Sequence, residues 1–224
     1  MVPPPVPECA PEAVEEFRNL LIGAAREAGR QFKPRQLEGM ITHYRILLKW
    51  GRRMNLTGLR DAKAIAWRHF VEPVETADLI GDEGKLVDLG SGNGFPAIPL
   101  AVMHPRLRLV LVESSQKKSE FLWAVIRELG LRQARVETRR VERRSDLDDL
   151  LPTDYFTFRA IRGSDLLAGE GEAVLRPGGR LLAYVSRRDA ARLRRNPIAG
   201  LQWSGAWPLS SGKNAVVAIL EPDA

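Results

Sequence analysis

A glycine-rich segment, residues 90–94, has residue types and spacing that suit contact with a nucleotide-like ligand. It reads Gly90-Ser91-Gly92-Asn93-Gly94 and follows a short apolar run that contains Asp88, with the composition of a buried parallel strand. Glycines lack the side chains that would keep the backbone away from a ligand. Pro96 stands where a helix could begin, since proline is favoured in the first helical turn. This order predicts a nucleotide-type pocket at the carboxyl end of a strand.

A second acidic residue supports this pocket. The next apolar run ends at Glu113, about 20 residues beyond the glycines, where a carboxylate would accept hydrogen bonds from a ribose diol. Asp88, the glycines and Glu113 occur in this order in both NAD-binding and S-adenosylmethionine-binding Rossmann folds. The glycine spacing is G-x-G-x-G and differs from the G-x-G-x-x-G of dinucleotide folds. An NAD-dependent oxidoreductase is therefore the least favoured reading.

A later segment, Pro177-Gly178-Gly179, favours S-adenosylmethionine as the ligand. We expect it to lie between a helix over residues 166–175 and a strand over residues 180–185, an arrangement typical of S-adenosylmethionine-dependent methyltransferases. The strand over 154–158 is followed by Arg159-Ala160, and not by the Asn/Asp-Pro-Pro-Tyr/Phe of enzymes that methylate exocyclic amines. Carbon-5 methylation of pyrimidines needs a cysteine nucleophile. The single cysteine, Cys9, precedes every predicted element, so both chemistries are disfavoured.

The motifs together resemble the glucose-inhibited division protein B family, whose members are ribosomal small-subunit methyltransferases G. The resemblance runs from about residue 40 to residue 186, and the string Gly94-Phe95-Pro96 with Ile98-Pro99-Leu100-Ala101 is its most specific part. It implies methyl transfer from S-adenosylmethionine to N7 of a guanine in 16S ribosomal RNA. The cofactor-binding residues expected are Asp88, Gly90, Ser91, Gly92, Gly94, Phe95, Glu113, Val141, Glu142 and Arg159. The alternative for Arg159 is a plain ion pair with Glu142 or another carboxylate.

This chemistry needs no catalytic side chain. N7 of guanine already carries an in-plane lone pair, so no base has to remove a proton, and the site has to align N7, the methyl carbon and sulfur. We therefore expect no catalytic acid, base or nucleophile and no metal ion. The methyl donor and the methylated base are both cationic, so arginines near the pocket should hold phosphate, the cofactor carboxylate or guanine O6.

The chain is basic, with a formal net charge of +6 over 224 residues, which suits a phosphate-rich partner. An arginine-biased genome or solvated surface charges would explain the excess equally well. The candidates for RNA contact are Arg52, Arg53, Lys117, Lys118, Arg140 and Arg187, which flank predicted elements. The expected partner is 16S ribosomal RNA or the 30S subunit. With no apparent signal peptide, membrane span or disulfide, we expect a cytoplasmic monomer without membrane contact.

These residues are expected on one α/β unit, a Rossmann-like seven-stranded class I methyltransferase sheet behind an N-terminal helical cap. Residues 1–11 are expected to be a disordered, proline-rich tail. Residues 12–80 should form the cap, with helices over 12–29 and 36–50 and Asp61 as a helix N-cap. Residues 81–224 should form the methyltransferase domain, which ends in an antiparallel hairpin.

One departure from the family pattern leaves the function open to other readings. Family members often carry a lysine shortly after the Pro-Gly-Gly strand, where this chain has Tyr184-Val185-Ser186-Arg187. Arg187 would have to replace that lysine, or its role would be lost. A small-molecule methyltransferase on the same fold and a non-enzymatic RNA- or ribosome-binding protein are therefore the alternatives.

Overall fold

The computed structural model describes residues 11–51, 61–159, 167, 174–212 and 214–223. Nearly all of the predicted tail lies outside these residues, and α1 (Pro11–Glu27) begins at its last position. Arg52 and Arg53 also lie outside them, as does most of the helix predicted over 166–175.

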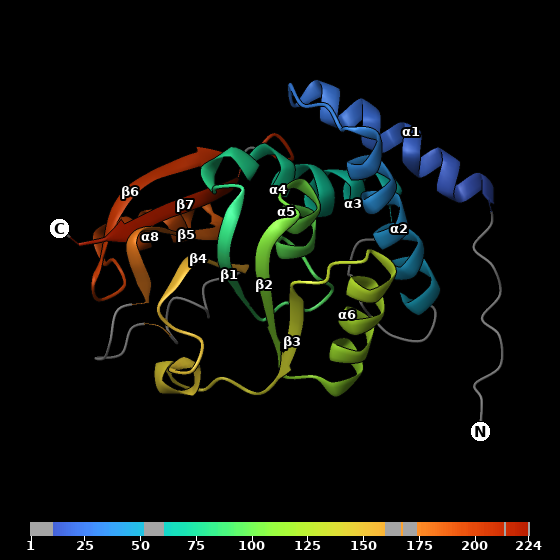
Figure 1. The fold of residues 1–224 in the computed structure, drawn as a ribbon. Helices are drawn as coiled ribbons and strands as arrows, with labels where there is room; N and C mark the ends of the chain where they lie inside the picture. The colour runs from blue at the N-terminus through green and yellow to red at the C-terminus, as the bar shows by residue number, and fades with distance from the viewer. Residues whose placement is uncertain (1–10, 52–60, 160–166, 168–173, 213, 224) are drawn as a thin grey trace.

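A seven-stranded sheet forms the centre of the molecule, with the strand order β3-β2-β1-β4-β5-β7-β6 (Figure 1). The strands β1 to β5 are parallel, and β7 is antiparallel to both of its neighbours. This confirms the predicted sheet and its closing hairpin. The strands are β1 (Glu83–Leu89), β2 (Arg106–Glu113), β3 (Ala134–Thr138), β4 (Thr153–Arg159), β5 (Leu175–Ser186), β6 (Leu201–Pro208) and β7 (Ala215–Pro222).

The helices before the sheet begin with two amphipathic ones, α1 and α2 (Pro34–Gly51), close to their predicted positions. Asp61 caps the next helix by accepting a 2.8 Å hydrogen bond from the Ala64 N–H, as predicted. That helix passes into a π-helical segment, which sequence patterns did not predict. The remaining helices are α3 (Ala62–Ile65), the π-helix η1 (Ala66–Val71), α4 (Glu72–Glu75), the 3₁₀ turn η2 (Ala77–Leu79), α5 (Ala97–Met103), α6 (Gln116–Glu128), the 3₁₀ turn η3 (Arg144–Leu147) and α8 (Arg187–Arg195).

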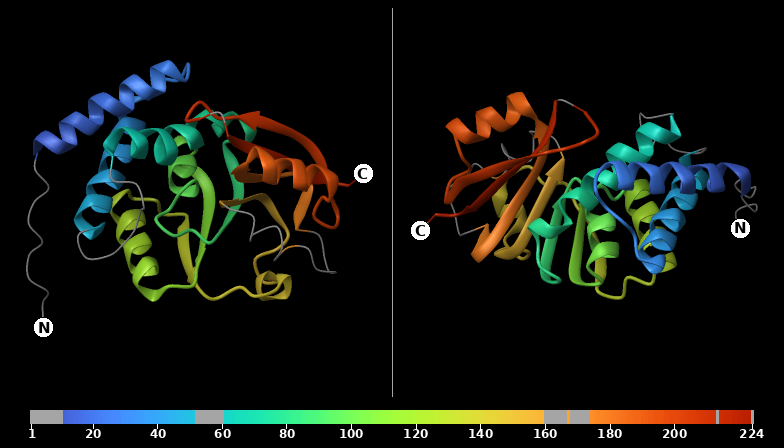
Figure 2. Two further views of the ribbon diagram at one scale, coloured as in Figure 1. Left: turned by 180° about the vertical axis from the view of Figure 1, so that it is seen from behind. Right: turned by 90° about the horizontal axis from the view of Figure 1, so that it is seen from above.

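Both faces of the sheet are buried. Alternate residues of each strand point to opposite faces, so Leu86 of β1 packs into one core cluster and Val87 into the other. The first cluster joins the sheet to α1, α2, α5 and α6, and the second joins it to η3 and α8. The N-terminal helices lie at one end of the sheet and the β6–β7 hairpin at the other (Figure 2). The cap therefore packs continuously with the sheet.

The prediction that a helix ends at the Pro-Gly-Gly segment is wrong. This segment lies within β5, which begins at Leu175. Leu175 pairs with Thr153 and Arg180 pairs with Tyr155, so residues 176–179 bulge opposite one residue of β4. Pro177 has no N–H to donate to a ladder, and Gly178 adopts a positive φ of 76°, which explains the bulge.

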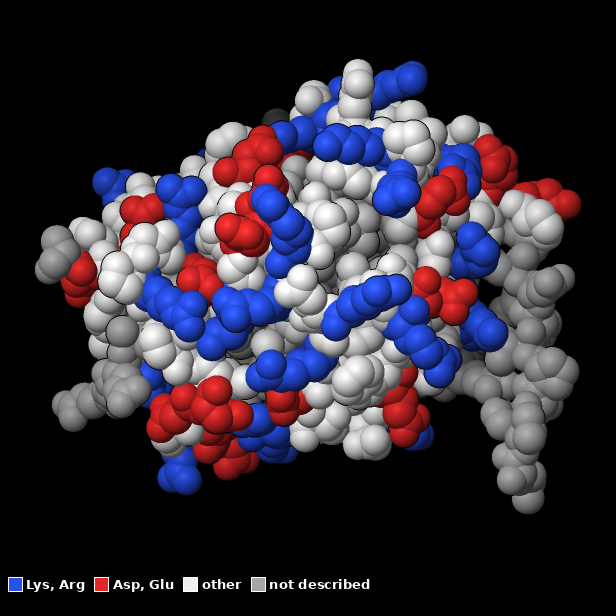
Figure 3. Space-filling model, in the orientation of Figure 1, with Lys and Arg blue, Asp and Glu red and all other residues white. Residues whose placement is uncertain are grey.

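Basic side chains are unevenly placed on the surface. Figure 3 shows a band of Lys and Arg across the middle of one face, where Figure 1 draws β4, β1 and β2, and a group of Asp and Glu near its lower margin. Among the described residues, no helix is both long and apolar enough to cross a membrane.

Candidate functional site

The predicted pocket residues lie where neighbouring parallel strands end, which we call the carboxyl edge of the sheet. Because β1 lies between β2 and β4, Asp88, Glu113 and Arg159 come from three adjacent strands. The chain passes from β1 to β2 on one side and from β4 to β5 on the other, so the direction of connection reverses between β1 and β4. Open α/β sheets form ligand crevices at such a point. Backbone N–H groups of Gly90 and Ser91 donate to the Val112 carbonyl at 2.9 and 3.0 Å, which ties the glycine loop to β2.

The glycine loop needs its glycines for two different reasons. Gly90, Gly92 and Gly94 have φ values of 72°, 55° and 85°, a region that side chains rarely allow. A Cβ added at Gly94 would collide with the Ile98 side chain, so this glycine is needed for packing. At Gly90 an added Cβ would meet nothing within 4 Å. Gly90 therefore leaves open space beside the backbone, where a ligand could approach.

Asp88 is a buried carboxylate with one unused oxygen. It is 1% exposed, and its Oδ1 accepts a 2.7 Å hydrogen bond from the Thr157 hydroxyl. Its Oδ2 is buried and has no hydrogen-bond partner among the described residues. Burial raises the pKa of Asp88 to about 6, although the hydrogen bond from Thr157 acts in the opposite direction. A buried acceptor without a donor is costly, so this oxygen suits a donor on a ligand.

Glu113 holds the loop as well as facing the predicted pocket. Its Oε2 accepts from the Gly92 N–H at 2.8 Å, and its Oε1 accepts from the Ser115 N–H at 2.8 Å. A carboxylate has about four lone-pair sites, so further donors such as a ribose diol can be accommodated. Ser91, 1% exposed, adds a 3.0 Å hydrogen bond from its hydroxyl to the Asp88 carbonyl.

Phe95 is enclosed by two histidines from the cap. The His43 ring stacks on one face at 4.5 Å between centroids, and the His69 ring stacks at 4.4 Å. Phe95 is 4% exposed, so its side chain faces these rings, and contact with a ligand would come through its backbone. Sequence reasoning missed His43, although it lies three residues after Met40 and four before Leu47 on the buried stripe of α2.

Both histidines are neutral at ordinary pH. Burial lowers the pKa of His43 to about 3, and burial together with the charge of Arg159 lowers that of His69 to about 3. The Nε2 of His43 donates a 2.9 Å hydrogen bond to the Asn93 carbonyl in the glycine loop. The cap therefore positions the loop through a stack and a hydrogen bond, without adding positive charge.

Arg159 is paired with a buried carboxylate of the cap. Its guanidinium lies 2.9 Å from Glu72 Oε2, donates to the Arg68 carbonyl at 3.1 Å and lies over the Tyr184 ring at 5.3 Å. The Ser211 hydroxyl donates to the other oxygen of Glu72. The structure thus shows an ion pair for Arg159, with Glu72 and not with Glu142. Sequence reasoning missed Glu72, which no motif marks.

A cavity of about 650 Å³ opens beside this ion pair at the end of β5. Its lining includes Arg68, Glu72, Arg159, Tyr184, Val185 and Ser211. This volume lies within the range of small-molecule sites. The cavity would admit a group as large as a nucleobase next to the end of β4.

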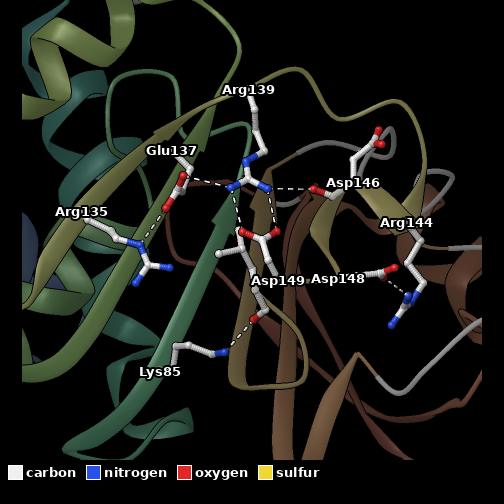
Figure 4. Close-up of polar contacts among 9 residues, drawn as sticks. Lys85, Arg135, Glu137, Arg139, Arg144, Asp146, Asp148 and Asp149 are labelled. Carbon is white, nitrogen blue, oxygen red and sulfur yellow. Dashed lines mark hydrogen bonds and ion pairs between the residues drawn. The ribbon is translucent and has the colours of Figure 1, made fainter.

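The segment after β3 contributes little enclosed side-chain surface. Val141 packs partly against the second core cluster, while the Glu142 side chain is 71% exposed and pairs with Arg140 at 2.9 Å. The neighbouring Arg139 is held by Asp149 at 2.7 and 2.9 Å and by Glu137 at 3.0 Å, as Figure 4 shows. The guanidinium of Arg139 is therefore already occupied by carboxylates.

The remaining candidates for RNA contact also lie at the carboxyl edge. Lys117 and Lys118 occupy the first turn of α6, directly after β2, with Lys117 exposed and Lys118 half-buried. Arg187 begins α8 at the end of β5, and its N–H donates to the Asn214 carbonyl at 3.0 Å. Arg52 and Arg53 lie outside the described residues.

Comparisons with known proteins agree with the fold and the motifs. The family model described as GidB, rRNA small subunit methyltransferase G, matches residues 36–204. A ribosomal RNA small subunit methyltransferase G of Stenotrophomonas maltophilia is 36% identical over 190 residues, which cover 82% of this chain and 86% of that protein. Another, from Xanthomonas oryzae pv. oryzae, is 41% identical over 147 residues, 64% of this chain and 66% of that protein.

Two solved structures are similar in fold at low sequence identity. A SAM-dependent methyltransferase from Aquifex aeolicus aligns with a TM-score of 0.52 at 14% identity, over 68% of this chain and 90% of that one. A fibrillarin pre-rRNA processing protein from Methanococcus jannaschii aligns with a TM-score of 0.53 at 12% identity, over 73% and 74% of the two chains. These confirm the predicted Rossmann-like methyltransferase fold.

Proposed function

The chain belongs to the GidB family, rRNA small subunit methyltransferase G, and from this premise we propose that it transfers a methyl group from S-adenosylmethionine to N7 of a guanine in 16S ribosomal RNA. The observation that carries the proposal is the glycine loop at the carboxyl edge, flanked by Asp88 and Glu113, in a chain that matches this family over residues 36–204. Its partner is RNA, as naked 16S rRNA or within the 30S subunit, and the enzyme acts as a cytoplasmic monomer.

The residues present fit the cofactor. The open space beside Gly90 admits a ligand against the backbone, and the unused Oδ2 of Asp88 offers a buried acceptor. Asp88, Glu113 and the backbone of the glycine loop would hold the cofactor, with Val141 and Glu142 beside its base. S-adenosylmethionine, when bound, supplies an electrophilic methyl group on a positively charged sulfur.

The electrostatics of the carboxyl edge suit a cationic donor and a cationic product. An unpaired positive side chain there would repel both. Burial keeps His43 and His69 neutral, and Glu72 compensates the charge of Arg159. These residues orient the reacting groups and exclude water. None of them has to move a proton, because N7 attacks with its own lone pair. The cavity beside Arg159 would receive the guanine.

Two measurements test the proposed function. Calorimetry should show stoichiometric binding of S-adenosylmethionine and S-adenosylhomocysteine and no binding of NAD. Mass spectrometry of 16S rRNA from cells with and without the gene should show one 7-methylguanosine that depends on it. Binding of the cofactor without any change in rRNA would favour a small-molecule methyltransferase. Absence of cofactor binding would favour a non-enzymatic RNA-binding protein.

A Glu113→Ala variant tests the cofactor-binding residues directly. It should weaken cofactor binding by about 1–3 kcal/mol, because it removes a buried acceptor and leaves donors unpaired. The same variant frees the Gly92 N–H. Unchanged affinity in calorimetry would remove Glu113 from the cofactor site.

A further inference from the structure

A second cavity, of about 590 Å³, lies at the opposite end of the parallel strands, where they begin. We call this side the amino edge. Arg106 and Arg108 reach the cavity from β2 and Arg176 reaches it from β5, while Glu83 and Asp154 are the acidic side chains of its lining. The segments beside them include Gly84, Gly178 and Gly179, which present backbone without side chains.

These three arginines have longer carboxylate contacts than Arg139, Arg144 and Arg180. Arg108 lies 3.9 Å and Arg176 3.3 Å from the same residue, Asp154, whose Oδ2 also accepts a 2.6 Å hydrogen bond from the Lys85 N–H. Arg106 lies 3.6 Å from Asp82, which His104 approaches to 2.9 Å. One carboxylate thus serves two guanidinium groups, and the other is shared with a histidine.

Arginines with their own carboxylates show the contrast. Arg180 pairs with Glu221 at 2.8 Å and Arg144 with Asp148 at 2.6 Å, and Figure 4 shows Arg139 between Glu137 and Asp149. A guanidinium has five N–H donors in a fixed fork. The long, shared contacts at the amino edge leave most of these donors available to an anion.

The electrostatic surroundings agree with a surplus of positive charge. Burial lowers the pKa of Lys85, which lies in the middle of β1, and the charges of Arg176, Arg108 and Arg135 lower it further against the opposing effect of Asp154. Figure 3 shows a band of Lys and Arg on the face where Figure 1 draws β1, β2 and β4. An anion bound there would offset this charge.

The arrangement suits a chain of phosphates better than a single small anion. Arg106 and Arg108 are two residues apart on one strand, so their Cα atoms are separated by about 6.7 Å along one face. Arg176 adds a third cation from β5, which β1 and β4 separate from β2. The side chains of Arg106, Arg108 and Arg176 are 65%, 58% and 45% exposed, which leaves them accessible to a large ligand.

We propose that the amino-edge cavity binds phosphates of the RNA backbone, as a second contact surface remote from the site of methyl transfer. The inference rests on the proposed function in taking RNA as the ligand. β1 has seven residues, so the two edges lie about 23 Å apart, and one RNA must pass around the sheet to reach both. The cavity would then contribute affinity for RNA and leave cofactor binding unaffected.

The test measures binding of 16S rRNA by fluorescence anisotropy across a salt series, without cofactor. In R108Q/R176Q the slope of log affinity against log salt should decrease by about 0.7–0.9 for each phosphate that the variant no longer binds. The variant R108K/R176K keeps the charges and should retain the wild-type slope. R194Q/R195Q removes the same charge from exposed positions of α8 and should change the slope less.

Each outcome decides the proposal. An unchanged slope in R108Q/R176Q, or an equal change in R194Q/R195Q, would overturn it, because the effect would then be absent or would reflect net charge alone. A titration with inorganic phosphate separates the sources: competition at micromolar phosphate would indicate a small-anion site and overturn the RNA assignment. Cofactor calorimetry on the same proteins reports on the proposed function separately, since the binding assay needs no methyl transfer.

Discussion

The two edges of the sheet carry charge in opposite ways. At the carboxyl edge the ionisable groups of the predicted pocket are buried or paired: Asp88 is 1% exposed, His43 is fully enclosed, and Arg159 faces Glu72. At the amino edge Arg106, Arg108 and Arg176 are about half-exposed and share carboxylates. Salt screens exposed charges far more than buried ones. The carboxyl edge should therefore respond to pH, and the amino edge to ionic strength.

The largest effect is expected on cofactor affinity, from a Gly→Val substitution at the carboxyl edge that is compared with the same substitution at the amino edge. Gly90→Val places a branched side chain at a φ of 72°, in the space where the ligand would approach, and should reduce cofactor affinity by about 100-fold or more. Gly178→Val is the matched control, since its φ is 76° and an added Cβ also meets nothing within 4 Å. Calorimetry and thermal unfolding measure both. Equal cofactor affinity in the two variants would place the pocket elsewhere.

The next effect comes from removing a countercharge. Glu72→Gln leaves Arg159 without its carboxylate, which should raise the barrier to methyl transfer by about 1–3 kcal/mol, less than for a fully buried pair because Arg159 is 26% exposed. Single-turnover methylation measures this effect. Glu221→Gln breaks the more exposed pair with Arg180 and should raise the same barrier by less than about 1 kcal/mol. Similar losses in both variants would contradict the comparison.

A smaller, pH-dependent effect is expected from His43→Phe. Unfolded His43 takes up a proton near pH 6.5 and the folded residue near pH 3, so acidification between these values favours unfolding. Wild type should therefore lose stability relative to His43→Phe by about 1.4 kcal/mol per pH unit below 6.5. Denaturant unfolding at pH 7.5, 6 and 5 measures this, and the comparison cancels groups that both proteins retain, such as His69 and Asp88. If the free energies of unfolding of the two proteins changed with pH in parallel, His43 would not be enclosed.

The smallest effect is expected from an exposed charge at the carboxyl edge. Arg140→Ala breaks a contact with Glu142 in which the two side chains are 80% and 71% exposed. Surface pairs of this kind contribute little to folding stability. Because the amino edge is proposed to bind the phosphates, RNA affinity should change by about twofold or less. A reduction in affinity as large as that of R108Q/R176Q in the same anisotropy assay would assign the main phosphate contacts to the carboxyl edge.

The sequence predicted those features that depend on local patterns. The strands, the glycine loop and the place of Glu113 follow from apolar periodicity and glycine spacing, and the structure brings these residues together. The structure contradicts the predicted helix end at Pro-Gly-Gly, because pairing with β4 draws Leu175 into a strand. Glu72 and His43 could not be assigned to the site from local patterns, since each meets its partner more than 45 residues away along the chain.

The closing hairpin has a consequence for biosynthesis. β7 is made after β6 yet lies between β6 and β5, so the sheet cannot be completed until β7 has left the ribosome. Ser210 and Ser211, in the connection between these strands, donate to the buried carboxylates Glu75 and Glu72. A nascent chain that ends before this connection lacks these donors. The connection between β6 and β7 thus supplies part of the polar environment of α4, which is translated long before it.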